Sequence, residues 1–310
     1  MPPMATAKAT EEGEVTPQLC EYYAEKSAGG YLGLILTEHS YVSPEGKAGK
    51  GQLSIADDHT IKGLTDLTRV IHKNGSLVMA QISHAGAAAK TEITGKRVLG
   101  ASTIALPQTG NVPAEMTLED IQKVIANFTA AAVRAKKAGF DGVEIHSAHR
   151  YLLNQFYSPL SNKRTDSYHA KTVENRLRLH LEILQSIRSV VGKDYPIALR
   201  LGACDYTEGG TTLEDSVEAA RILEQAGIDL LDISGGFCGY TRPGAKEQGY
   251  FQELTEAIKK AVSIPVLLTG GITEAAAAES LLKENKADLI GVGRAILKDS
   301  LWAKQAILAS

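Results

Sequence analysis

The chain has 310 residues, of which 44% are hydrophobic and 22% charged, so it carries enough apolar material for a large folded core. Its 33 basic and 36 acidic side chains give a net charge of −3 and form no block of like charge, so neither a nucleic acid nor a membrane surface is expected as a partner. The three cysteines form no CxxC pair, and no signal peptide or long apolar run is present, so we expect a cytoplasmic protein without a cysteine-held metal.

Short apolar runs alternate with longer amphipathic segments along nearly the whole chain. The predicted strands are, in chain order, Gly33–Thr37, Ser76–Gln81, Gly142–His146, Pro196–Leu201, Asp229–Ser234, Pro265–Gly270 and Asp288–Gly293. Near-continuous apolar strands are typical of a parallel sheet that is covered on both faces. The fragment before Pro2 and Pro3 is the candidate for an eighth strand, which would be truncated.

The segments between these strands carry helix signals. Thr117 is a predicted N-cap, Asp120 lies in the first turn, an apolar stripe begins at Ile121, and Gly139 ends the helix. A weak repeat recurs at Asp141, Asp229 and Asp288, where a helix ends, the chain turns and an aspartate opens a strand. This alternation favours a single (β/α)8 TIM barrel over residues 1–310, in the α/β class. A doubly wound sheet is the alternative, although no GxGxxG motif follows an early strand.

The longest stretch without a regular pattern is Ser83–Met116, which is rich in proline and glycine near its end. A long loop on the carboxyl side of a barrel is often a substrate lid or a wall of the active site. The alternative is a structural excursion that covers the barrel mouth.

In such a barrel, chemistry takes place at the carboxyl ends of the strands. The polar residues and glycines at these positions are Gln81, His84, His146, His149, Tyr151, Arg200, Gly270, Gly271, Gly293 and Arg294. Glycines after the last two strands let backbone N–H groups approach an anion, and an arginine adds a charge-assisted contact. These glycines therefore indicate a phosphorylated ligand, or else they only allow tight turns.

His146 and His149 lie three residues apart, just beyond a strand end. They could donate hydrogen bonds to an oxygen that gains negative charge, hold a metal together with Glu144, or serve the structure alone. No HxxxH or HExxH pattern supports the metal, and we predict none. Arg200 ends an apolar strand and needs a partner there, either an acidic residue or a negatively polarised ring or substrate.

Several of these positions belong to longer motifs. Residues 139–149 read GFDGVEIHSAH, and residues 151–156 read YLLNQF. Further motifs are Pro3-Met4, Thr37-Glu38, Ser43–Gly46, His84–Gly86, Ser158–Asn162, Arg164–Asp166, Glu174–Arg176, Gly270-Gly271 and Gly291–Arg294. On these motifs, which run in order across the chain, the sequence resembles the Old Yellow Enzyme family of NADH:flavin oxidoreductases and ene-reductases, related to the barrel domain of 2,4-dienoyl-CoA reductases.

The resemblance implies an FMN-dependent NAD(P)H oxidoreductase that reduces the activated C=C bond of α,β-unsaturated carbonyl compounds by hydride transfer from flavin N5. His146 and His149 would bind the carbonyl oxygen of this small electrophilic alkene, and Tyr151 would protonate its α-carbon. The implied cofactor-binding residues are Pro3, Met4 and Ala5 beside the flavin ring, Gln81 and Arg200 at its polar edge, and Gly270, Gly271, Gly293 and Arg294 at the phosphate. Relatives in this family often pair, which leaves a homo-oligomer open.

Among the departures of the sequence from the family pattern, two have direct consequences for stability and catalysis. Met1 stands almost at the Pro-Met motif, where the family has a preceding strand, so we expect reduced stability and weaker flavin retention. Arg150 replaces the usual glycine before Tyr151; if φ is positive there, the arginine is strained, and it could turn Tyr151 away or place a cation at the pocket rim. These departures leave open a flavin-binding barrel with impaired catalysis. Two further alternatives are an amine-oxidising flavin barrel and a phosphate-binding barrel enzyme without flavin.

Overall fold

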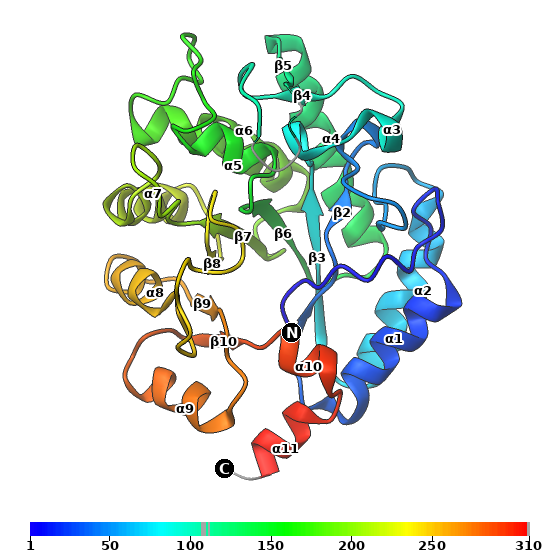
Figure 1. The fold of residues 1–310 in the computed structure, drawn as a ribbon. Helices are drawn as coiled ribbons and strands as arrows, with labels where there is room; N and C mark the ends of the chain where they lie inside the picture. The colour runs from blue at the N-terminus through cyan, green and yellow to red at the C-terminus, as the bar shows by residue number, and fades with distance from the viewer. Residues whose placement is uncertain (107–109, 111, 309–310) are drawn as a thin grey trace.

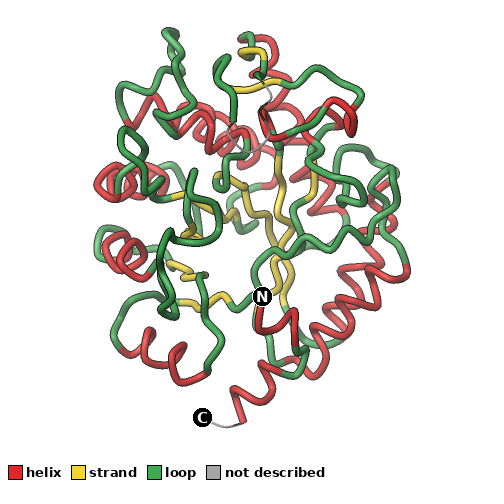
Figure 2. The backbone as a smooth tube through the Cα atoms, in the orientation of Figure 1, coloured by secondary structure: helices red, strands yellow, loops and turns green. Residues whose placement is uncertain are grey.

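The computed structural model describes residues 1–106, 110 and 112–308. Parallel strands curl around its centre, and most helices lie outside them (Figures 1 and 2). In the described part of the chain, the main sheet pairs in the order β1-β3-β6-β7-β8-β9-β10, with β2 beside β3. This is the predicted (β/α)8 architecture.

The strands are β1 (Leu34–Leu36), β2 (Ser40–Tyr41), β3 (Leu77–Ser83), β4 (Leu99–Gly100), β5 (Ala114–Glu115), β6 (Gly142–Ser147), β7 (Ile197–Gly202), β8 (Leu230–Ser234), β9 (Val266–Thr269) and β10 (Leu289–Gly291). The helices are α1 (Pro17–Ser27), α2 (Thr60–Lys73), α3 (Thr91–Thr94), α4 (Leu118–Lys137), α5 (Leu152–Tyr157), α6 (Val173–Val191), α7 (Leu213–Gln225), α8 (Gln252–Lys259), α9 (Ala275–Lys283), α10 (Arg294–Lys298) and α11 (Trp302–Leu308). Short 3-10 turns are η1 (Ala28–Gly30), η2 (Pro44–Gly46) and η3 (Gly86–Ala88). All seven strands predicted from internal apolar runs are present, with ends that shift by a residue or two.

The N-terminal segment lies beside β1. The Met1 amine donates to the Leu34 carbonyl over 2.8 Å, and the Leu36 N–H donates to the Met1 carbonyl over 2.9 Å, but no strand is assigned before α1 in the described residues. Within the same residues, β10 and β1 do not pair. An apolar groove of about 330 Å³, lined by residues such as Leu267 and Ile290, therefore lies at this seam of the barrel.

Alternation along each strand separates the barrel interior from the helix-covered exterior. The apolar positions Val143 and Ile145 of β6 are fully buried in the large core. Gln81 and Glu144 are partners in the register between β3 and β6, and Arg200 pairs with Asp232 between β7 and β8. These four polar groups make hydrogen bonds or ion pairs with one another, so the interior carries a polar layer beneath the barrel mouth.

The recurring aspartates join neighbouring strands at their amino ends. The Asp141 carboxylate accepts the Val78 N–H over 2.8 Å, and Asp229 and Asp288 accept the first N–H of β7 and β9 over 2.8 and 2.9 Å. Each aspartate N–H also donates to the carbonyl of that same partner residue. Each aspartate of the repeat therefore provides two hydrogen bonds at the amino end of a strand pair. Without them, the backbone N–H and C=O groups of the partner residue would lack these partners.

The helix start predicted at Thr117 is confirmed as a reciprocal capping box with Asp120. The stretch Ser83–Met116 holds short regular elements, namely η3, α3 and the β4-β5 pair, while residues 107–109 and 111 lie outside the described part. None of the described helices is both long and apolar enough to cross a membrane.

Candidate active site

A cavity of about 510 Å³ opens at the carboxyl ends of the barrel strands. Its volume lies in the range of small-molecule and cofactor sites, roughly 300–1,000 Å³. The catalytic and cofactor-binding residues that the family resemblance implies all line it: Pro3, Met4, Ala5, Gln81, His146, His149, Tyr151, Arg200, Gly270, Gly271, Gly293 and Arg294. The topology places these residues together because parallel barrel strands all end at the same face.

One end of the cavity is built from glycines and an arginine. Gly271 has φ +69°, and a Cβ there would lie 2.6 Å from the Tyr250 ring. A Cβ at Gly293 would lie 3.0 Å from the Met4 sulfur. The Arg294 guanidinium donates to the Tyr250 hydroxyl over 3.3 Å and has no carboxylate partner among the described residues. At this end a ligand can therefore approach the backbone closely, and the positive charge of Arg294 has no carboxylate partner among the described residues.

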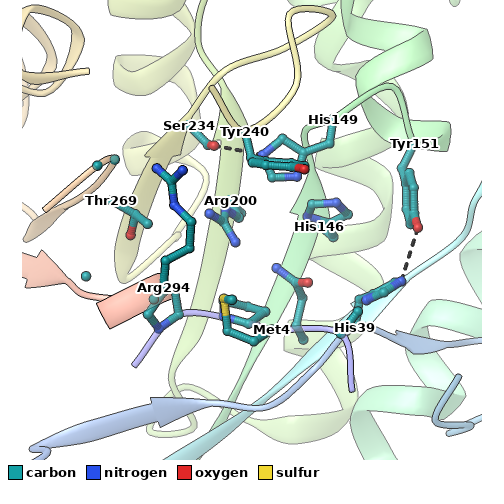
Figure 3. Close-up of a pocket in the computed structure, with 18 of the residues that line it drawn as sticks. Met4, His39, His146, His149, Tyr151, Arg200, Ser234, Tyr240, Thr269 and Arg294 are labelled. Atoms are coloured by element: carbon teal, nitrogen blue, oxygen red, sulfur yellow. Dashed lines mark hydrogen bonds between the residues drawn. The ribbon is translucent and has the colours of Figure 1, made fainter. Parts of the chain in front are cut away.

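Arg200 lies in the middle of the cavity, between Arg294 and His146 in the view of Figure 3. Its Nε is 3.2 Å from the Asp232 carboxylate, so Arg200 has the acidic partner that a buried arginine needs. The guanidinium nevertheless lines the cavity as well. Nearby, the Gln81 amide donates to Glu144 over 2.6 Å, and burial, together with the neighbouring Asp232, raises the pKa of Glu144 to about 8. The central wall thus presents the Arg200 guanidinium to the cavity, with the buried carboxyl groups of Glu144 and Asp232 next to it.

His146 and His149 lie side by side at the other end, with ring centroids 5.2 Å apart. The His149 Nε2 is 2.7 Å from the Ser234 hydroxyl, which fixes the ring orientation. Burial holds the pKa of both histidines well below the usual range, and the positive charge of Arg200 acts in the same direction. Both rings are therefore neutral at neutral pH, and each keeps one N–H donor.

Tyr151 completes this end of the cavity. Its ring packs edge-on against His146, with centroids 5.1 Å apart, and its hydroxyl is 3.1 Å from the His39 Nε2 (Figure 3). Burial raises the pKa of Tyr151 to about 12, so the phenol keeps its proton at neutral pH. Burial and the charge of Arg200 lower the pKa of His39 to about 4.

Arg150 has φ +66° and follows His149 at φ +58°, so the strain expected from an arginine at this position is present. Its guanidinium donates a short hydrogen bond to the Phe237 carbonyl, in the loop that follows β8. Arg150 also lines the cavity, while Tyr151 still faces it. The arginine therefore adds a cation to the wall and does not turn Tyr151 away.

Sequence reasoning missed several lining residues, namely His39, Ser234, Tyr240, Tyr250 and Thr269. Ser234 and Thr269 end observed strands, so the strand-end rule that found Arg200 could have found them too. His39 follows β1 by the same rule, whereas the two tyrosines lie on a loop without a readable pattern.

One expectation is corrected, and the lining of the cavity also bears on the two alternatives for the long loop. His84 does not line the cavity, because its Nδ1 accepts the Gly86 N–H over 3.0 Å within its own turn. No described residue of the stretch Ser83–Met116 lines the cavity either, which favours the structural excursion over a lid.

Sequence comparison gives relatives over nearly the whole chain. It is 41% identical over 312 residues to an NADH oxidase of Thermoanaerobacter brockii, which covers 99% of this chain and 48% of the relative. It is 39% identical over 309 residues to an NADPH dehydrogenase of Halalkalibacterium halodurans, at 99% and 89% coverage. The chain thus spans about half the length of the first relative and most of the second.

Solved structures superpose closely on the fold. A 2-naphthoyl-CoA reductase in complex with 2-naphthoyl-CoA gives a TM-score of 0.91 at 29% identity, covering 99% of this chain and 50% of that one. An Old Yellow Enzyme homologue from Zymomonas mobilis gives 0.87 at 26% identity, with 100% and 88% coverage. The model of the NADH:flavin oxidoreductase / NADH oxidase family matches residues 1–307. The resemblance seen in the sequence is therefore confirmed, and the chain belongs to this family of FMN-dependent NAD(P)H oxidoreductases.

Proposed function

We propose that the protein reduces the activated C=C bond of small α,β-unsaturated carbonyl compounds, with FMN as cofactor and NAD(P)H as reductant. One observation carries the proposal. A single cavity is lined by Gly271, Gly293 and Arg294 at one end and by two neutral histidines at the other. Arg200 lies between Arg294 and the histidines (Figure 3). The glycines and Arg294 suit the phosphate of a redox cofactor, and the two histidines suit the carbonyl group of a substrate.

The residues of the cavity fit FMN. Backbone at Gly271 and Gly293 would hold the phosphate, because a side chain at either position would collide with Tyr250 or Met4. Arg294, which lacks an acidic partner in the described part of the chain, would neutralise the phosphate charge. The Gln81 amide and the Arg200 guanidinium would face the polar edge of the flavin, and Arg200 would stabilise negative charge there. When bound, FMN would supply hydride-transfer chemistry between NAD(P)H and the substrate.

The two histidines would bind the carbonyl oxygen of the substrate. Negative charge grows on this oxygen as the β-carbon gains a hydride, so a donor aimed at it stabilises the transition state more than the ground state. Neutral imidazoles serve this purpose because each keeps an N–H, and His149 is already oriented by Ser234. One such donor is worth about 2.7–4 kcal/mol of barrier.

Tyr151 would protonate the α-carbon. Its raised pKa keeps the phenol protonated, and its place beside His146 sets it next to the carbonyl end of a bound substrate. A positioned general acid contributes roughly 10²–10⁴-fold to the rate. The alternative of impaired catalysis is not favoured by Arg150, since Tyr151 lines the cavity despite the positive φ of its neighbour.

A visible spectrum tests the proposal. The purified protein mixed with FMN should show flavin absorbance that stays with the protein on gel filtration. Anaerobic NADPH or NADH should bleach this absorbance, and 2-cyclohexenone should restore it. An unsaturated acyl-CoA thioester belongs in the same panel, because one structural relative binds 2-naphthoyl-CoA. Absence of flavin uptake in excess FMN would overturn the proposal.

Arg294→Ala tests the phosphate end with its own control. We expect FMN affinity to fall about 10–100-fold, the factor typical of a hydrogen bond to a charged group. Riboflavin lacks the phosphate, so its affinity should be the same in the variant and the parent. An equal loss for both flavins would show that Arg294 does not bind the phosphate.

A further inference from the structure

The loop between β1 and β2 brings a histidine against the proposed acid. His39 follows β1, and its backbone is held on two sides. The Gln52 amide donates to the His39 carbonyl over 3.0 Å, and the N–H of neighbouring Glu38 donates to the Tyr23 hydroxyl over 2.8 Å. The loop therefore presents the His39 ring to the cavity from a fixed position (Figure 3).

The His39 ring meets Tyr151 in two ways. Its Nε2 is 3.1 Å from the phenol oxygen, and the two ring centroids are 5.6 Å apart at an interplanar angle of 63°. On its other side the Tyr151 ring packs against His146. The phenol thus stands between a histidine of the carbonyl-binding pair and a second histidine 112 residues earlier in the chain.

We propose that His39 is a positioning and proton-relay residue for Tyr151. The inference rests on the proposed function, because it assigns to His39 the return of the proton that Tyr151 gives to the substrate. A neutral imidazole has one N–H and one bare nitrogen. When Nε2 carries the hydrogen, it donates to the phenol oxygen and leaves the phenol's own hydrogen free to point into the cavity.

The proton balance closes with solvent water as the only further reactant. The O–H bond of Tyr151 breaks as a C–H bond forms at the α-carbon, which leaves a phenolate. The His39 Nε2–H bond then breaks as the phenol O–H bond forms again, and in the same step Nδ1 accepts a proton from water, which leaves hydroxide in the solvent. The ring therefore passes directly between its two neutral tautomers and returns to the first one by proton exchange with solvent. One solvent proton is consumed in each turnover, and the imidazole is never left charged.

The surroundings of His39 favour this neutral relay. The charged and titratable groups that act on it are Arg200 of β7, His146 and His149 at the end of β6, and Tyr151. No carboxylate among the described residues is hydrogen-bonded to its ring to stabilise an imidazolium. A relay that passes only between neutral tautomers needs no carboxylate beside the ring, whereas a protonated imidazole acting as the acid would need one.

Half-reactions separate the relay from the rest of the chemistry. In His39→Gln and His39→Ala, reduction of the bound flavin by NADPH should slow much less than its reoxidation, since Tyr151 transfers no proton in the reductive step. Anaerobic reoxidation by 2-cyclohexenone should slow about 10–100-fold, the factor expected for one hydrogen bond to a charged group. Added imidazole should restore part of the rate in His39→Ala and none in His39→Gln, which fills the space.

A double variant tests whether His39 acts through Tyr151. Tyr151→Phe alone should slow reoxidation, and adding His39→Ala to it should change the rate by less than about twofold, because contacting residues in one network are not additive. Multiplicative losses would show that His39 acts independently of the phenol and would overturn the relay.

The ring nitrogens provide a readout without turnover. Nitrogen-15 shifts of His39, assigned by difference from His39→Gln, should show a neutral ring with the hydrogen on Nε2 at pH 7, and Tyr151→Phe should shift Nε2. A protonated ring, or an Nε2 shift that is the same in Tyr151→Phe and in the parent, would overturn the proposal. A parent protein that takes up no flavin or ignores the enone would instead refute the proposed function, whereas an active parent with fully active His39 variants would refute only the relay.

Discussion

Arg150 offers a direct measurement of backbone strain at the rim of the site. The residue holds φ +66°, and its guanidinium is hydrogen-bonded to the Phe237 carbonyl in the loop after β8. Arg150→Ala removes the hydrogen bond and keeps the strain of a Cβ at positive φ. Arg150→Gly removes both. The two variants therefore share one loss and differ only in the backbone.

The magnitudes follow from these two effects. Loss of a hydrogen bond to a charged group costs about 1.5–3 kcal/mol, which both variants incur. A Cβ in the left-handed region costs roughly 1–2 kcal/mol, and only the glycine variant escapes it. Glycine also has greater conformational freedom in the unfolded chain, which lowers the stability of the glycine variant by about 0.4–1 kcal/mol. The glycine variant should therefore be more stable than the alanine variant by up to about 1.6 kcal/mol, with a central value of about 0.8 kcal/mol, and the lost hydrogen bond should leave both less stable than the parent.

Thermal unfolding followed by circular dichroism, with flavin removed from all three proteins, measures the difference. About 1 kcal/mol corresponds to roughly 2–4 °C in a protein of 150–250 residues, and somewhat less in a longer one. The melting temperature of the glycine variant should accordingly lie about one to a few degrees above that of the alanine variant. If Arg150→Ala melts at or above Arg150→Gly, then the position stores no strain and the reasoning is wrong.

Two further predictions concern the barrel itself. Gly291→Ala should lower the free energy of unfolding by about 1–3 kcal/mol, because its Cβ would lie 2.0 Å from the Thr269 hydroxyl on the neighbouring strand; Gly33→Ala, whose Cβ meets nothing within 4 Å, is the control, and equal denaturant midpoints would contradict the packing argument. His180 is fully buried against the Ser147 hydroxyl, and burial lowers its pKa from 6.5 to about 3, so its folded form binds fewer protons than its unfolded form. Its contribution to stability is therefore complete above about pH 6.5 and is lost as the pH falls toward 3, at a limiting slope of about 1.4 kcal/mol per pH unit. Denaturant titrations at a series of pH values should show a shallower slope for His180→Asn than for the parent, and an unchanged slope would mean that this histidine is charged in the folded protein.

Much of the framework follows from local sequence features. Apolar runs bounded by turn residues predict the strands because burial on both faces demands them, and Thr117 with Asp120 predicts a helix start because the cap satisfies free N–H groups. The strand-end rule needs no coordinates either. Once a barrel is inferred, residues such as Arg200 and Gly293 must share one face, and the structure places them in one cavity.

The contacts between side chains of distant loops were decided only by the tertiary structure. Tyr151 meets His39 across 112 residues and Arg150 meets Phe237 across 87, and neither pair has a spacing that a sequence pattern could reveal. The recurring aspartates show the same division, because the sequence displays their repeat while only the strand register shows that each binds the preceding strand. Periodicity records which face of an element is buried, but the partner of a polar side chain depends on how separate elements pack, and that is a property of the folded whole.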